Sequence, residues 1–216
     1  MMSRLAPYRL GVLLSGRGSN FAAIQAAIEA GEIPNTQVGV VISNHAQAGG
    51  LQLATNKGIP TVALDKQAFE NRMAFDAALV DILQQHHIDL VILAGYDRII
   101  SAPLLAAYER RILNIHPSLL PAYGGKGMVG LKVHQAVLAQ GERESGCSVH
   151  LVTAVVDDGP VLGQSRVAIT ANETPESLAA KVLMQEHQLY PQVIRQYIET
   201  VLSQEGKTDS HDKALI

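Results

Sequence analysis

Residues 114–121 carry an amide and an imidazole two positions apart, in the run Asn-Ile-His-Pro-Ser-Leu-Leu-Pro. The apolar residues before them predict a β-strand, and alternation along a strand puts Asn114 and His116 on the same side. Pro117 then ends the strand because it has no N–H to donate. Such a pair suits a reaction through a tetrahedral oxyanion, in which the amide holds the developing charge and the imidazole moves a proton. The alternative is a polar strand end that leads into a loop.

The run Asp157-Asp158-Gly159-Pro160 is first of all a turn signal. If this turn lies at the same edge of the sheet as His116, its carboxylate favours the charged imidazole and raises the pKa of the ring toward the operating pH. A His–Asp pair can then take a proton from an amine nucleophile and supply one to an oxyanion through a single water. A purely structural turn is the alternative.

Residues 15–20, Ser-Gly-Arg-Gly-Ser-Asn, join a predicted strand to a predicted helix. Free backbone amides at the start of a helix form an anion site, and glycine lets a phosphate come close. A Walker A motif is absent, and the dinucleotide fingerprint fails because Phe21 replaces its third glycine and Ser43-Asn44 replaces the ribose-binding acid. The loop therefore favours a small phosphorylated substrate over NAD, and an ordinary tight turn is the alternative.

Other polar residues give weaker signals. Tyr96 and Arg98 follow a predicted buried strand, so they line either a pocket at the sheet edge or a surface loop. His150 lies on an alternating strand, where a hydrogen-bonded core histidine is the commoner role. His86 and His87 have no third ligand at a typical spacing, so no metal site is predicted.

Length and composition predict one domain. The chain has 216 residues, of which 47% are hydrophobic, enough for one sizeable core over residues 1–203, followed by a polar, disordered tail over residues 204–216. Lys and Arg number 17 and Asp and Glu 20 without a basic stretch, which argues against nucleic-acid binding. No apolar run reaches the roughly 18–20 residues of a membrane span. One cysteine, Cys147, and no signal-peptide pattern predict the cytoplasm.

The hydrophobic pattern predicts an α/β fold with a mainly parallel twisted sheet and helices on both faces, because apolar strands alternate with helices. The last two strands alternate in polarity and are expected to pair as an antiparallel hairpin at one edge. Pro191 is expected to kink or break the last helix. The expected strands cover residues 8–14, 37–42, 61–64, 89–94, 111–114, 147–153 and 161–169, and the expected helices cover residues 21–30, 50–56, 69–86, 103–108, 133–140 and 175–202.

Three motifs occur in order: residues 15–20, residues 114–121, and Gly-Cys-Ser-Val-His-Leu-Val-Thr followed by Asp-Asp-Gly-Pro at residues 146–160. Together they resemble the folate-dependent phosphoribosylglycinamide formyltransferases, over about residues 9–191. The resemblance implies a Rossmann-like formyltransferase fold and transfer of a formyl group from 10-formyltetrahydrofolate to the amine of 5-phosphoribosylglycinamide, in purine biosynthesis. It also implies small-molecule substrates, no metal, no nucleic-acid or membrane partner, and a monomer or homodimer.

The resemblance assigns roles to three sets of residues. The catalytic set is Asn114, His116 and Asp157, with Asp157 chosen over its neighbour because the family motif reads Asp-x-Gly. The set that holds the phosphate and ribose of the substrate is Gly18, Ser19, Asn20 and Glu186. The set that holds the formyl folate is Arg72, Tyr96, Asp97, Arg98, Ile99, Ile100, Asn114, Thr153, Ala154, Val155, Val156 and Asp157.

In the mechanism that the resemblance implies, Asn114 and a protonated His116 stabilise the oxyanion, and Asp157 keeps the ring charged and anchors a water. Two departures from the family stand out. Residues 123–131 are longer than the corresponding loop of many members and are expected to act as a lid, and Asp97 replaces a methionine, which is expected to shift folate affinity.

Three other functions compete with formyl transfer to the ribonucleotide. A formyltetrahydrofolate hydrolase would use the same three catalytic residues, normally with a regulatory domain at its N-terminus. A transfer-RNA formyltransferase would need a C-terminal RNA-binding domain and a positive surface. A phosphosugar-binding module would use the glycine loop and leave residues 114–160 unexplained.

Overall fold

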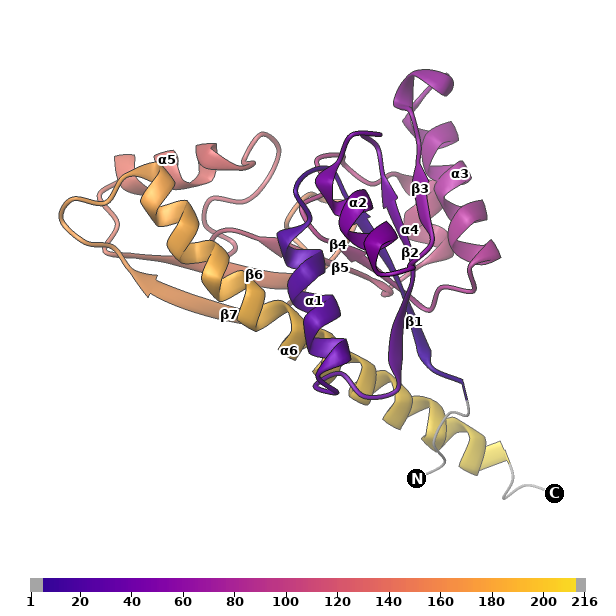
Figure 1. The fold of residues 1–216 in the computed structure, drawn as a ribbon. Helices are drawn as coiled ribbons and strands as arrows, with labels where there is room; N and C mark the ends of the chain where they lie inside the picture. Colours follow the sequence, from indigo (N-terminus) through magenta and orange to yellow (C-terminus); the bar gives the residue numbers. More distant parts are fainter. Residues whose placement is uncertain (1–5, 213–216) are drawn as a thin grey trace.

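The computed structural model describes the backbone of residues 6–212 and the side chains of residues 6–201. Its centre is a seven-stranded sheet of order β3-β2-β1-β4-β5-β6-β7 (Figure 1). The strands are β1 Tyr8–Leu14, β2 Thr36–Ser43, β3 Thr61–Ala63, β4 Leu90–Leu93, β5 Ile112–His116, β6 Glu144–Leu151 and β7 Val161–Ala168. β1 to β5 pair in parallel, whereas β6 and β7 pair antiparallel at one edge, which confirms the predicted fold class and hairpin.

Helices cover both faces of the sheet. They are α1 Ser19–Glu29, α2 Gly49–Asn56, α3 Arg72–Gln85, α4 Ala102–Ala107, α5 Leu131–Ala139 and α6 Pro175–Asp212, with a short 3-10 helix, η1, at Lys66–Ala68. Successive residues of a strand point to opposite faces of the sheet and so belong to two separate hydrophobic cores. Val12 packs with α1, α2, α5 and α6 on one face, and Leu13 packs with α3 and α4 on the other. Most boundaries lie within three residues of those predicted.

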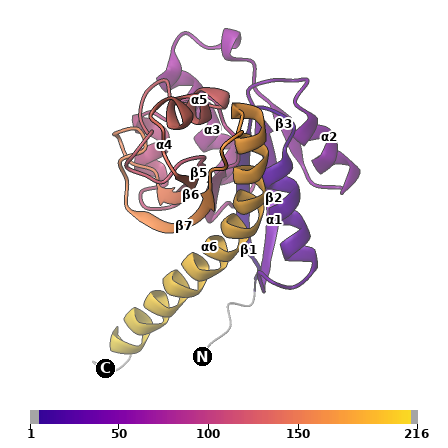
Figure 2. The same cartoon turned by 90° about the vertical axis from the view of Figure 1, so that its left-hand side faces the viewer.

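The end of the chain differs from the sequence prediction. The predicted break at Pro191 is wrong, because α6 continues through this residue. Tyr190, Val193 and Ile194 are buried on both sides of the proline and hold the helix against the sheet. α6 runs to Asp212, past residue 204 where a disordered tail was expected, and residues 213–216 lie outside the described part. Figure 2 shows this last part of α6 extending beyond the body of the molecule. Among the described residues, no helix is long and apolar enough to cross a membrane.

Candidate active site

A cavity of about 630 Å³ opens at the carboxyl ends of β4 and β5. Parallel strands bring their carboxyl ends to one edge, which is where open α/β sheets bind ligands. Its lining includes the apolar side chains of Leu93, Ile100 and Val152, named here the apolar wall, and the polar side chains of Asn114 and His116. The side-chain alternation predicted for β5 thus brings the amide and the imidazole to the same cavity.

Asp157 reaches this cavity from the turn after β6. Its Oδ2 atom lies 3.5 Å from Nδ1 of His116, and its Oδ1 atom lies 3.5 Å from Nε2 of His150. The turn is pressed onto β6, since a Cβ atom at Gly159 would lie 1.8 Å from the carbonyl oxygen of Leu151. Glycine is therefore required two positions after Asp157, which gives the Asp-x-Gly pattern a steric reason.

His150 orients Asn114. The Nδ1 atom of His150 lies 2.9 Å from the carbonyl oxygen of Leu151, so Nδ1 carries the proton in the neutral ring. Its Nε2 atom then accepts a hydrogen bond from the amide nitrogen of Asn114 at 3.0 Å. An amide NH₂ group has two N–H bonds, so this contact leaves the second one for a ligand.

The pKa of His116 departs from the prediction. Burial of the ring lowers the pKa below the ordinary value, and attraction to Asp157 and the carbonyl of Tyr123 offsets this only in part. The neighbouring His150 lowers the pKa further. The predicted increase is therefore wrong for the free protein, because loss of solvation outweighs the carboxylate. Burial also disfavours ionisation of Asp157, but its contacts with His150 and His116 and the hydrogen bond from the backbone amide of Gly125 hold its pKa below the usual value.

The backbone of residues 123–131 contacts both titratable groups. The carbonyl oxygen of Tyr123 lies 2.8 Å from Nε2 of His116, and the amide of Gly125 donates to Oδ2 of Asp157 at 2.9 Å. A carbonyl oxygen only accepts, so Nε2 of His116 holds a proton and Nδ1 is the nitrogen that remains for proton transfer. Residues 125–130 also line the cavity, and the lid role of residues 123–131 stays a prediction.

The glycine loop lies at the carboxyl end of β1, two strands away from β5. Gly18 precedes α1 with φ of 79°, and a Cβ atom there would lie 2.5 Å from Cα of Gly50 in α2. Asn20 donates from Nδ2 to Oε2 of Glu186 at 2.7 Å, which joins the loop to α6. The Oδ1 atom of Asn20 is buried and has no hydrogen-bond partner in the described part of the chain. An acceptor left in this state fits a ligand that brings a hydroxyl donor.

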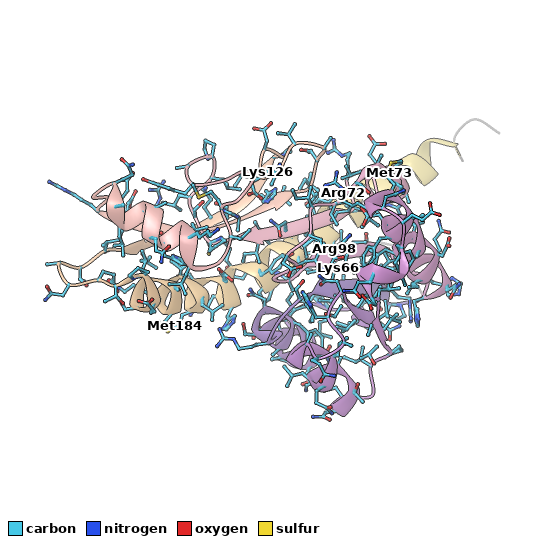
Figure 3. All side chains as sticks on the ribbon, turned by 90° about the horizontal axis from the view of Figure 1, so that it is seen from above. Lys66, Arg72, Met73, Arg98, Lys126 and Met184 are labelled. Atoms are coloured by element: carbon cyan, nitrogen blue, oxygen red, sulfur yellow. The ribbon has the colours of Figure 1, made fainter. Side chains whose placement is uncertain are left out.

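The residues predicted to hold the formyl folate gather mostly at the cavity. Those that line it are Tyr96, Asp97, Arg98, Ile99, Ile100, Asn114, Thr153, Val155, Val156 and Asp157. Ala154 and Arg72 are outside the lining, and Arg72 begins α3. Figure 3 labels Arg72, Arg98 and Lys126, which come from α3, the segment after β4 and residues 123–131. The guanidinium of Arg98 stacks on Phe75 at 4.2 Å from the ring centroid.

Sequence reasoning missed two parts of this site. His150 was interpreted as an ordinary core histidine, and its only signal was a place on the strand that pairs with β5, where it faces Asn114. The contacts from Tyr123 and Gly125 use backbone atoms, which every residue type carries. Among the described residues, no group of three or more His, Cys, Asp or Glu side chains is arranged to hold a metal ion.

Residues 8–194 match the family model described as Formyl transferase, so the chain belongs to the formyl transferase family. Several relatives within this family carry the name of one particular enzyme. Phosphoribosylglycinamide formyltransferase of Escherichia coli (strain K12) is 40% identical over 203 residues, which are 94% of this chain and 90% of that protein. The chloroplastic phosphoribosylglycinamide formyltransferase of Vigna unguiculata is 46% identical over 191 residues, which are 88% of this chain.

The chain spans 61% and 64% of the length of the two plant relatives. A crystal structure of glycinamide ribonucleotide transformylase 1 from Symbiobacterium toebii matches with a TM-score of 0.87 and 43% identity, covering 93% of this chain and 92% of that one. The resemblance indicated by the sequence motifs is therefore confirmed by relatives that carry the same name.

Proposed function

We propose that the protein transfers the formyl group of 10-formyltetrahydrofolate to the amine of 5-phosphoribosylglycinamide, a step of de novo purine biosynthesis. The observation that carries the proposal is the meeting of Asn114, His116 and Asp157 at one cavity. The relatives named above support the choice of substrates. The apolar wall of the cavity suits a flat heteroaromatic group, and the buried free acceptor of Asn20 suits a ribose hydroxyl.

When bound, 10-formyltetrahydrofolate supplies the formyl group. The second N–H bond of Asn114 donates to the formyl oxygen, where negative charge develops as the amine attacks. His116 is neutral in the free protein, so Nδ1 first accepts a proton from the amine, directly or through a water held by Asp157. The charged ring then stabilises the negative oxygen and returns the proton to the leaving nitrogen, while Asp157 favours the charged ring.

The glycine loop and α6 hold the other end of the ribonucleotide in this proposal. Backbone amides at Gly18, Ser19 and Asn20 bind the phosphate at the N-terminus of α1, and Glu186 binds the ribose. Burial raises the pKa of Glu186, and the hydrogen bond from Asn20 opposes that shift. A phosphate held at one end orients the amine toward the formyl carbon at the other.

The proposed substrates are small molecules, and the proposed compartment is the cytoplasm. The plant relatives are named chloroplastic, so location differs within the family. The free and buried Cys147 is in keeping with a reducing compartment. A monomer or homodimer, without nucleic-acid or membrane partners, remains a prediction.

The test is to mix the purified protein with 10-formyltetrahydrofolate and follow release of tetrahydrofolate with and without 5-phosphoribosylglycinamide. Release that requires the ribonucleotide is expected; release without it indicates a hydrolase, and no release indicates a binding module. His116→Ala should lower turnover by on the order of 10²- to 10³-fold while both substrates still bind. Nearly unchanged turnover in this variant would exclude His116 from the chemistry.

A further inference from the structure

Asp97 lines the cavity, and its carboxylate contacts side chains outside the cavity lining. Its Oδ1 atom accepts a hydrogen bond from Nδ2 of Asn44 at 2.8 Å and lies 3.0 Å from Oγ of Ser15. Its Oδ2 atom lies 3.0 Å from Nε2 of His45. The carboxylate of Asp97 is therefore not an isolated charge in the apolar wall, because polar side chains contact both of its oxygen atoms.

The partners of Asp97 come from neighbouring strand ends. Ser15 follows β1, Asn44 and His45 follow β2, and Asp97 follows β4, while the sheet order is β2-β1-β4. Asp97 therefore reaches across the end of β1 to β2. Two hydrogen bonds from backbone amides strengthen the same junction: the amide of Asp97 donates to Oγ of Ser15 at 3.0 Å, and the amide of Ser15 donates to the carbonyl of Gly95 at 3.0 Å.

Ser15 is the first residue of the glycine loop, so these contacts fix the position of the start of the loop. Its hydroxyl also lies 2.6 Å from Oδ1 of Asn44, and all three side chains restrain one another. Asp97 is half-exposed, with 53% of its side chain accessible. Burial disfavours its ionisation, yet hydrogen bonds from His45, Asn44 and Ser15 hold its pKa below the ordinary value. The carboxylate is thus charged at neutral pH and satisfied by these donors.

We propose that Asp97 is a positioning residue for the glycine loop, so that it sets affinity for the phosphorylated substrate and leaves affinity for the formyl folate unchanged. This inference rests on the proposed function and refines it. The place of Asp97 in the cavity lining suggests a contact with the formyl folate, whereas this inference assigns Asp97 to the ribonucleotide. The reason is direct: the side-chain contacts of Asp97 lead to the phosphate loop.

The experiment compares Asp97→Met and Asp97→Asn in the full chain. Methionine removes the carboxylate that bonds to Asn44 and His45 and leaves the Ser15 hydroxyl with Asn44 alone. The KM for 5-phosphoribosylglycinamide should therefore rise about three- to tenfold, with kcat and the folate KM unchanged. Asparagine keeps one oxygen for Ser15 and Asn44 and turns its amide to His45, so it should restore most of the affinity. Asp81→Met, at an exposed position on α3, is the matched control and should change neither KM.

Direct binding separates the two proposals. Calorimetry should give a dissociation constant for the ribonucleotide that follows KM across the variants, and thermal unfolding should verify that each variant folds. If Asp97→Met does not fold, His45→Ala, which removes a single contact, should raise the ribonucleotide KM by about twofold. An active wild-type protein whose variant loses folate affinity, or keeps ribonucleotide affinity, overturns this inference alone. A wild-type protein without ribonucleotide-dependent release overturns the proposed function together with it.

Discussion

The Nδ1 atom of His116 lies 3.5 Å from Oδ2 of Asp157, with only 6% and 10% of the two side chains exposed. At this distance the carboxylate attracts a charged ring without forming a short hydrogen bond, which leaves room for a proton to enter between them. Burial works in the opposite direction and lowers the pKa of His116 in the free protein. The pair therefore begins the reaction with a neutral ring and an ionised carboxylate.

The first prediction concerns Asp157→Asn. Burial lowers the pKa of His116, and the charge of Asp157 is the strongest effect that raises it. Without this charge the pKa should fall further below 6.5. NMR titration is the measurement, and the resonance of the His116 ring is assigned because it is absent from the spectrum of His116→Asn. In Asp157→Asn this resonance should titrate at a lower pH than in the wild-type protein. Because a neutral ring is needed to accept the proton, the acid limb of kcat/KM should move to lower pH as well. Turnover should fall by about 10²- to 10⁴-fold. An unchanged or higher pKa would show that Asp157 does not act on this ring.

A second prediction concerns His150, which holds the amide of Asn114 through Nε2 at 3.0 Å. His150→Phe removes the acceptor and should lower kcat by about tenfold or more, because the amide loses its orientation toward the formyl oxygen. His150→Gln restores an acceptor and should recover part of the loss. Steady-state kinetics on both variants is the measurement, with binding of the two substrates as the control. Equal losses in both variants would mean that the ring acts through packing instead.

A third prediction separates the contact between Gly125 and Asp157 from backbone strain. Gly125 and Gly127 have φ values of 93° and 92°, and a Cβ atom at either position meets nothing within 4 Å. Alanine at each should therefore cost a similar amount of stability, about 1–2 kcal/mol. Alanine keeps the backbone N–H, but relief of strain at the positive φ should move it. Of the two amides only that of Gly125 bonds to Asp157, so Gly125→Ala should lower kcat several-fold more than Gly127→Ala. Thermal unfolding and kinetics on the two variants test this, and equal kcat values would remove the contact from the mechanism.

The parts of this site that follow from the sequence are those set by local geometry. Asn114 and His116 share a face because a strand alternates, and residues 15–20 mark a loop because glycine and a helix start are local features. The bond between Asn20 and Glu186 joins residues 166 positions apart, so no periodicity reveals it, and Glu186 came only from family resemblance. The direction of the His116 pKa shift was wrong because it depends on burial by the whole fold.

A last prediction uses the burial of Glu186, which raises its pKa above 4.5, although Asn20 opposes the shift. The folded protein then holds this proton more tightly than the unfolded chain, so the carboxyl favours folding most at pH below 4.5. That contribution is lost as the pH rises through the folded pKa. Glu186→Gln does not ionise and should therefore gain stability relative to the wild-type protein as the pH is raised above 4.5, in urea unfolding at several pH values. Glu70→Gln, at an exposed position, is the matched control, and a pH-independent difference for Glu186→Gln would contradict the raised pKa.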